Sequence, residues 1–141
     1  MIAYCDSSVL VRFILEQANS LVELASYDQL VTSVVTQVEC LRAIENARLR
    51  GELSDDALAG RRGAAYARLS GIERIEASPS ILAQAERSFG VVLKTLDAIH
   101  VATAIVWRER RAPGLVFATH DRQQARAAMA LGFEVLGATR G

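Results

Sequence analysis

Two patterns of hydrophobic and polar residues alternate along this chain. Short apolar or β-branched runs are typical of strands, whereas apolar residues that return every three or four positions are typical of helices. The short runs predict strands at residues 1–5, 30–35, 72–77, 115–119 and 133–136. The helical spacing predicts a helix carrying Val9, Leu10, Phe13 and Ile14, and further helices at residues 19–27, 36–50, 54–69, 80–89, 96–110 and 122–131.

This alternation of strands and helices predicts an α/β fold with a parallel sheet covered on both faces. Residues 97–107 are apolar on nearly every side of their helix, so that helix is expected to be sandwiched between other elements. With 141 residues, of which 51% are hydrophobic, the chain suits one globular core. We therefore expect one domain spanning residues 1–141.

Charge and cysteine content narrow the class of protein. The 16 basic residues, all but Lys94 arginines, balance 16 acidic ones, which excludes a strongly basic nucleic-acid coat and an acidic tail. Two cysteines make no disulfide framework, which favours a reducing compartment. No signal peptide and no bilayer-spanning run are expected, so the sequence predicts a cytoplasmic protein without a membrane partner.

Four acidic residues stand near the expected carboxyl ends of strands or at helix starts: Asp6, Glu39, Asp97 and Asp121. In an open parallel sheet these positions share one edge, where such folds place their sites. Four unpaired carboxylates would repel one another and raise each other's pKa, a conflict that a divalent cation resolves. Oxygen ligands favour Mg²⁺ or Mn²⁺ over zinc, and such an ion can activate water against a phosphodiester.

Each acid also has a structural alternative. Asp6 could cap the first helix, Thr36 and Glu39 match a capping box, and Asp97 would favour its helix dipole. Asp121 with Gln124 matches a second box. Spacing by itself leaves the choice between caps and ligands open.

Four segments of the chain resemble the successive motifs of PIN-domain nucleases, and most closely those of VapC-type toxins from bacterial toxin-antitoxin pairs. They are residues 4–8 (YCDSS), 36–39 (TQVE), 96–104 (LDAIHVATA) and 118–121 (ATHD), followed by residues 127–128 and 132–133. The LDAIH segment is the most specific of them. The resemblance implies a three-layer α/β/α sandwich with a central, mostly parallel sheet, and a Mg²⁺- or Mn²⁺-dependent endoribonuclease that hydrolyses RNA. It also implies a homodimer inhibited by a cognate antitoxin.

The resemblance also implies roles for single residues. The four acids match the family's metal-site acids, with Asp6 and Asp97 as direct ligands. Glu39 either binds a second ion or orients water, and Asp121 ligates directly or through water. Ser7 and Thr119 match small hydroxyl residues that orient a carboxylate or water. The alternative function is a non-catalytic module of the same fold that holds RNA or a protein partner.

Other polar residues have structural interpretations that we prefer. His100, three residues after Asp97, could complete a zinc pair but is better explained as a packed structural histidine. His120 could act as a general acid, although a loop histidine beside a cap is commoner. Cys5 and Cys40 are expected to be small buried residues. The arginines could hold RNA phosphates, but most are expected on a solvated or antitoxin-binding face.

Overall fold

The computed structural model describes residues 1–138, which form six α-helices, one 3₁₀ helix (η1) and five strands. In chain order the elements are β1 (Ile2–Cys5), α1 (Ser7–Ile14), η1 (Val22–Ser26), β2 (Gln29–Ser33), α2 (Val35–Leu49), α3 (Asp55–Ser70), β3 (Glu73–Ile75), α4 (Pro79–Ala85), α5 (Thr95–Arg110), β4 (Val116–Thr119), α6 (Arg122–Ala130) and β5 (Glu134–Gly137).

All five strands run parallel in one sheet of order β3-β2-β1-β4-β5. The first strand is therefore central: Ala3 pairs with Leu30 of β2 on one side and with Val116 of β4 on the other. Because the strands are parallel, their carboxyl ends lie at one edge of the sheet. The segments that follow β1, β2 and β4 leave from that edge.

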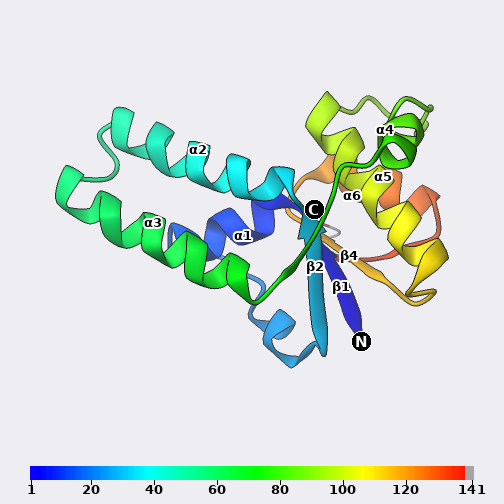
Figure 1. Cartoon of the computed structure of the whole chain (residues 1–141), viewed down its shortest axis with the longest axis horizontal. Coiled ribbons are helices and arrows are strands. Elements are labelled where there is room, and N and C mark those ends of the chain that lie inside the picture. Colours follow the sequence, from blue (N-terminus) through cyan, green and yellow to red (C-terminus); the bar gives the residue numbers. More distant parts are fainter. Residues whose placement is uncertain (139–141) are drawn as a thin grey trace.

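Helices cover both faces of the sheet (Figure 1). Side chains alternate along β1, so that Ala3 and Cys5 belong to the core beneath α1, α2 and α3. Tyr4 points to the opposite face and belongs to the core beneath α5 and α6. This arrangement confirms the expected three-layer α/β/α sandwich, with a sheet that is parallel throughout the described residues.

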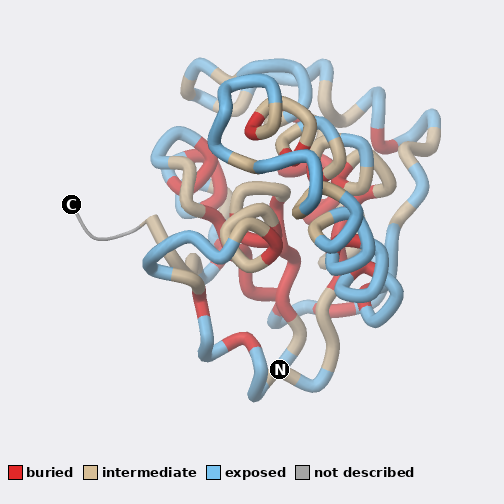
Figure 2. The backbone as a smooth tube through the Cα atoms, turned by 90° about the vertical axis from the view of Figure 1, so that its left-hand side faces the viewer, coloured by how far each residue is buried: buried red, intermediate tan, exposed pale blue. Residues whose placement is uncertain are grey.

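Helix α5 lies between the sheet and α4, as its apolar pattern predicts. Seven of its residues, from Ala98 to Ile105, are buried, and α4 packs against it. Figure 2 shows the buried residues in the interior of the molecule, and they include most residues of β1, β2 and β4. Within residues 1–138, no helix combines the length and the apolar character needed to cross a membrane.

Four predicted elements differ from the structure. The helix expected at residues 80–89 is the shorter α4, which ends at Ala85 with Glu86 as its C-cap. The helix expected at residues 19–27 is only the 3₁₀ helix Val22–Ser26, since Asn19 has a left-handed φ of 63° that an α-helix does not allow. Val34 already has helical dihedrals, so the strand expected to reach residue 35 ends at Ser33. The strand expected at residues 72–77 is limited to Glu73–Ile75 at the edge of the sheet.

Candidate active site

The four acids come from four separate segments near the carboxyl edge of the sheet. Asp6 follows β1 directly, and Asp121 stands two residues after β4. Glu39 lies near the start of α2, which follows β2, and Asp97 lies in the first turn of α5. The hydrogen bonds and charge interactions described below link all four.

Asp6 is the most deeply placed of the acids, with 2% of its surface exposed. Its Oδ1 accepts hydrogen bonds from the Ser8 hydroxyl at 2.5 Å and from the Val9 amide at 3.4 Å, so it caps α1. Its Oδ2 accepts from the Thr119 hydroxyl at 2.9 Å. Burial raises the pKa of Asp6 from 3.8 to about 6, against the opposing influence of His100 and of these hydrogen bonds.

Gln124 connects this acid to Asp97. The Thr119 hydroxyl lies 3.2 Å from Gln124 Oε1, and Gln124 Nε2 donates to Asp97 Oδ1 at 2.9 Å. The backbone amide of Gln124 donates to Asp121 Oδ1 at 2.8 Å, and the Asp121 amide donates to the Thr119 hydroxyl at 2.9 Å. The buried Gln124 side chain thus ties Asp97 to Thr119 beside Asp6, while backbone amides tie Asp121 to the same two residues, Thr119 and Gln124.

Glu39 is held by a second set of contacts. The Ser7 hydroxyl donates to Glu39 Oε2 at 2.9 Å, while His100 Nε2 lies 2.6 Å from Glu39 Oε1. On its other side, His100 Nδ1 lies 2.6 Å from the Tyr4 hydroxyl, and both rings are fully buried. Burial is the main cause that raises the pKa of Tyr4 well above its usual value of 10.0, so the phenol keeps its proton.

The acids also influence one another through their charges. Burial, then the neighbouring Asp121, and to a smaller extent Glu39 raise the pKa of Asp97. Mutual repulsion of this kind is the situation that a bound cation relieves, and the donors are carboxylate oxygens, which suit Mg²⁺ or Mn²⁺. The donor chemistry therefore fits such an ion.

The positions of the carboxylates are not those of a closed coordination shell. Within residues 1–138, no three Asp, Glu, His or Cys side chains lie close enough together to hold a metal ion. Carboxylate oxygens of all four acids instead accept hydrogen bonds from neighbouring protein groups. Coordination would require the carboxylates to turn from these donors toward a common point.

The capping alternatives have mixed outcomes. Asp6 and Asp121 do cap α1 and α6. The Thr36–Glu39 capping box is wrong, because α2 has no side-chain cap and the Thr36 hydroxyl instead contacts that of Thr32. Only one half of the Asp121–Gln124 box forms. The Gln124 amide donates to Asp121, but the Gln124 side chain bonds to Thr119 and Asp97 and does not return to the Asp121 backbone.

Within residues 1–138, the histidines and cysteines form no cluster that could bind zinc. His100 pairs with Glu39 rather than with Asp97, which agrees with its expected role as a packed residue. Cys5 and Cys40 are free and buried, as expected. His120 is half-buried, and burial followed by the charge of Arg12 lowers its pKa.

Some of the arginines form ion pairs with acidic side chains. Arg48 bonds to Glu45 and Asp55, and Arg50 bonds to Glu52. These contacts agree with the solvated face expected for most of them.

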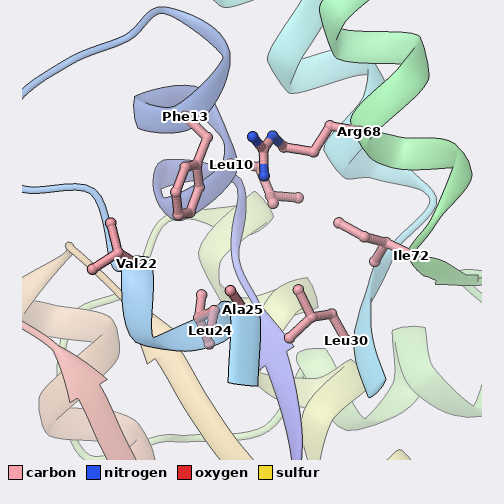
Figure 3. A pocket seen from close by; sticks show the side chains of 8 residues that line it. All are labelled: Leu10, Phe13, Val22, Leu24, Ala25, Leu30, Arg68 and Ile72. Atoms are coloured by element: carbon pink, nitrogen blue, oxygen red, sulfur yellow. The ribbon is translucent and has the colours of Figure 1, made fainter. Parts of the chain in front are cut away.

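An apolar pocket lies away from the acids, on the face covered by α1 and α3 (Figure 3). Its volume is about 290 Å³ and its lining contains none of the four acids. Arg68 lies over the Phe13 ring, with its guanidinium carbon 4.5 Å from the ring centroid. This pocket therefore shares none of the four acids with the candidate active site.

The model of the PIN domain family matches residues 3–129, which is nearly the whole chain. The chain belongs to the PIN domain family. The resemblance that the four motifs suggested is thereby confirmed at the level of the family. A search of curated protein sequences gave no significant match.

Solved structures share the PIN fold of this chain. One is a chain of a toxin-antitoxin complex from Klebsiella pneumoniae, with 18% identity, a TM-score of 0.66, and coverage of 99% of both chains. Another belongs to VapBC2 from Rickettsia felis bound to a DNA fragment from their promoter. It has 15% identity and a TM-score of 0.65, and the alignment covers 97% of this chain and 98% of the other.

Sequence reasoning missed three residues of this PIN-domain site. Tyr4, Ser8 and Gln124 all bond directly to the acids or to the residues that hold them. Gln124 was noticed only as a capping residue, although its position in the first turn of α6 beside Asp121 was a usable signal. Tyr4 carried no signal, since a tyrosine in a strand is most simply a core residue.

Proposed function

We propose that this PIN-domain protein is a VapC-type toxin of a toxin-antitoxin pair that acts as a divalent-metal-dependent endoribonuclease. The observation that carries the proposal is the meeting of Asp6, Glu39, Asp97 and Asp121 at the carboxyl edge of the sheet. These acids are far apart in sequence, yet hydrogen bonds through Thr119 and Gln124 connect Asp6, Asp97 and Asp121. Burial, then the charge of Asp121 and to a smaller extent that of Glu39, raises the pKa of Asp97. A purely structural role would not require four carboxylates at one edge.

The residues present would serve a Mg²⁺ or Mn²⁺ ion in distinct ways. Asp6 and Asp97 would hold it, with Glu39 and Asp121 beside them as ligands or as groups that orient water. When bound, such an ion activates water and offsets the charge of the attacked phosphate. Ser7 would orient Glu39 through its hydroxyl, and Thr119 would orient Asp6.

The partners in this proposal are RNA, a cognate antitoxin and a second copy of the chain. The two structural neighbours come from toxin-antitoxin complexes, which supports an antitoxin partner here. We place the whole chain, residues 1–141, in one nuclease domain, because helices on both faces share a single sheet. Free Cys5 and Cys40 and an RNA substrate fit an enzyme of the cytoplasm.

The direct test compares charge-neutral variants of the acids with the unmodified protein. Asp6→Asn and Asp97→Asn should each lower Mn²⁺-dependent cleavage of RNA by at least ~100-fold, since each removes a carboxylate from the charged centre. The cleavage ends should be 5′-phosphate and 3′-hydroxyl. Asp56→Asn is the matched control, because Asp56 is an exposed acid in the first turn of α3.

Full activity in either folded variant would overturn the assignment of these acids. Titration calorimetry with Mn²⁺ separates the enzyme from the non-catalytic alternative. Binding of Mn²⁺ that Asp97→Asn abolishes supports the enzyme. RNA binding without Mn²⁺ binding and without cleavage would instead favour a non-catalytic module.

A further inference from the structure

A second cavity, distinct from that in Figure 3, opens at the end of β5; none of the four acids lines it, but His120, the residue before Asp121, does. Its volume is about 810 Å³, within the range of small-molecule sites. It is lined by Arg12, Asn19, Leu21, Glu23, His120, Arg122, Val135, Leu136, Gly137 and Ala138. Three of these residues carry nitrogen donors on basic side chains, against one acid.

The basic side chains come from different elements. Arg12 lies in the last turn of α1, His120 in the connection after β4, and Arg122 at the first position of α6. One nitrogen of the Arg12 guanidinium donates to the Ala18 carbonyl at 3.3 Å, which leaves donors on the other nitrogens. Arg122 is exposed, and within residues 1–138 it forms no ion pair with an acid.

His120 adds an unsatisfied polar atom to the cavity wall. Its Nε2 is buried and lacks a hydrogen-bond partner within the described residues, although the residue as a whole is only partly buried. A buried nitrogen without a partner is uncommon in folded proteins, and such atoms often mark a position that a ligand or water completes. The cavity therefore combines positive charge with an unused hydrogen-bonding group.

The cavity wall is joined directly to the candidate active site. His120 stands between Thr119 and Asp121, and its backbone amide donates to the Ser8 hydroxyl at 3.0 Å. Ser8 in turn donates to Asp6 Oδ1. A chain molecule with one phosphate at the acids would thus have its neighbouring nucleotides close to this cavity.

We propose that this cavity is a substrate subsite that binds a phosphate of the RNA next to the one that is cleaved. The inference rests on the proposed function, because it takes RNA as the substrate. A cluster of acids repels a polyanion, so a nuclease gains from cations placed beside it. Arg12 and Arg122 supply that charge, and each can donate to two phosphate oxygens at once.

The experiment measures cleavage and binding of a short single-stranded oligoribonucleotide by Arg12→Gln, Arg122→Gln and the double variant. Each single variant should raise KM about tenfold while kcat stays within about twofold, since a charged hydrogen bond is lost outside the reacting centre. The slope of log affinity against log salt should fall by about 0.7 per arginine removed. Arg62→Gln, an exposed arginine of α3 outside this cavity, is the matched control.

A binding measurement separates failure of this subsite from failure of the proposed function. Fluorescence anisotropy with the same labelled RNA, in EDTA, should show weaker binding by the arginine variants than by Arg62→Gln. If the unmodified protein cleaves RNA but the arginine variants match the control in KM and anisotropy, the subsite is overturned. If it cleaves no RNA yet anisotropy separates the variants, the nuclease proposal fails and the anionic subsite stands.

Discussion

A chain of two hydrogen bonds connects Tyr4, His100 and Glu39. The chemistry of the groups indicates which atom donates in each bond. Tyr4 keeps its proton because burial raises its pKa, so its hydroxyl can donate to His100 Nδ1. If the Tyr4 hydroxyl donates in this way, we expect the ring proton on Nε2, where it is donated to Glu39 Oε1. Tyr4 thereby acts as a positioning residue: it fixes the imidazole that holds one oxygen of Glu39.

Tyr4→Phe tests this chain of hydrogen bonds with little change in core volume. Loss of the hydroxyl should lower kcat for RNA cleavage several-fold and leave KM nearly unchanged, because Glu39 loses its fixed orientation. Nitrogen-15 NMR of the imidazoles should show His100 protonated at Nε2 and bare at Nδ1. The chain has two histidines, so a His120→Gln variant assigns the signals.

Tyr66→Phe is the matched control for this prediction, because Tyr66 is exposed and lies outside this chain of hydrogen bonds. A proton found on Nδ1 of His100 would refute the assigned direction of the hydrogen bonds. Equal kcat in Tyr4→Phe and Tyr66→Phe would refute the positioning role.

At the scale of the elements, the end of β5 packs so closely against β4 that a larger side chain does not fit there. Gly137 has a φ of 113°, and a Cβ built there would lie 2.1 Å from the Thr119 carbonyl oxygen. The next residue, Ala138, donates its amide to that same carbonyl at 2.8 Å. The last strand therefore closes tightly over the end of β4, whose Thr119 side chain holds Asp6.

Gly137→Ala should destabilise the fold by about 3 kcal/mol or more, because alanine meets both the unfavourable φ and the carbonyl. Gly63→Ala in α3 should do the opposite and stabilise by about 0.5–1 kcal/mol, since nothing lies within 4 Å of its added Cβ. Urea denaturation of both variants measures the free energies of unfolding. Equal stability of the two would contradict the close packing at β5.

The strands and most helices could be predicted because their signals are local. Short apolar or β-branched runs marked the strands and helical spacing marked the helices, within a few residues of their observed bounds. The exceptions depend on backbone context: Asn19 takes a left-handed conformation and Val34 a helical one, against the preference of a β-branched residue. Asparagine tolerates the left-handed region without requiring it, and Val34 goes against its own propensity, so residue type by itself fixes neither conformation.

For the whole molecule, burial of Asp6 makes stability depend on pH. Its pKa is about 6 in the folded protein and near 3.8 without burial, so the folded state binds the proton more tightly. The stabilisation from protonation is complete below about pH 4 and is lost as pH rises through 6. The metal-free protein should therefore lose stability over this window.

Asp6→Asn removes this titration and should become the more stable protein above pH 6. A pKa difference of this size corresponds to about 3 kcal/mol at most. Urea denaturation of both proteins in EDTA at pH 4 and pH 7.5 measures the difference, which should grow toward the higher pH. A difference that stays constant between the two pH values would contradict the raised pKa.

The sequence by itself determined the order of strands and helices along the chain, the parallel α/β class and the expected place of the acids at the carboxyl edge. Motifs between residues 4 and 133 also indicated the PIN domain family, whose model matches residues 3–129. These follow from residue types and short spacings. Only the tertiary structure decided that Gln124 bridges Thr119 to Asp97 and that His100 faces Glu39 rather than Asp97. The same holds for the cavity formed by Arg12, His120 and Arg122. Tyr4 and His100 are 96 positions apart, and such contacts are set by strand register and layer packing, which no local pattern encodes.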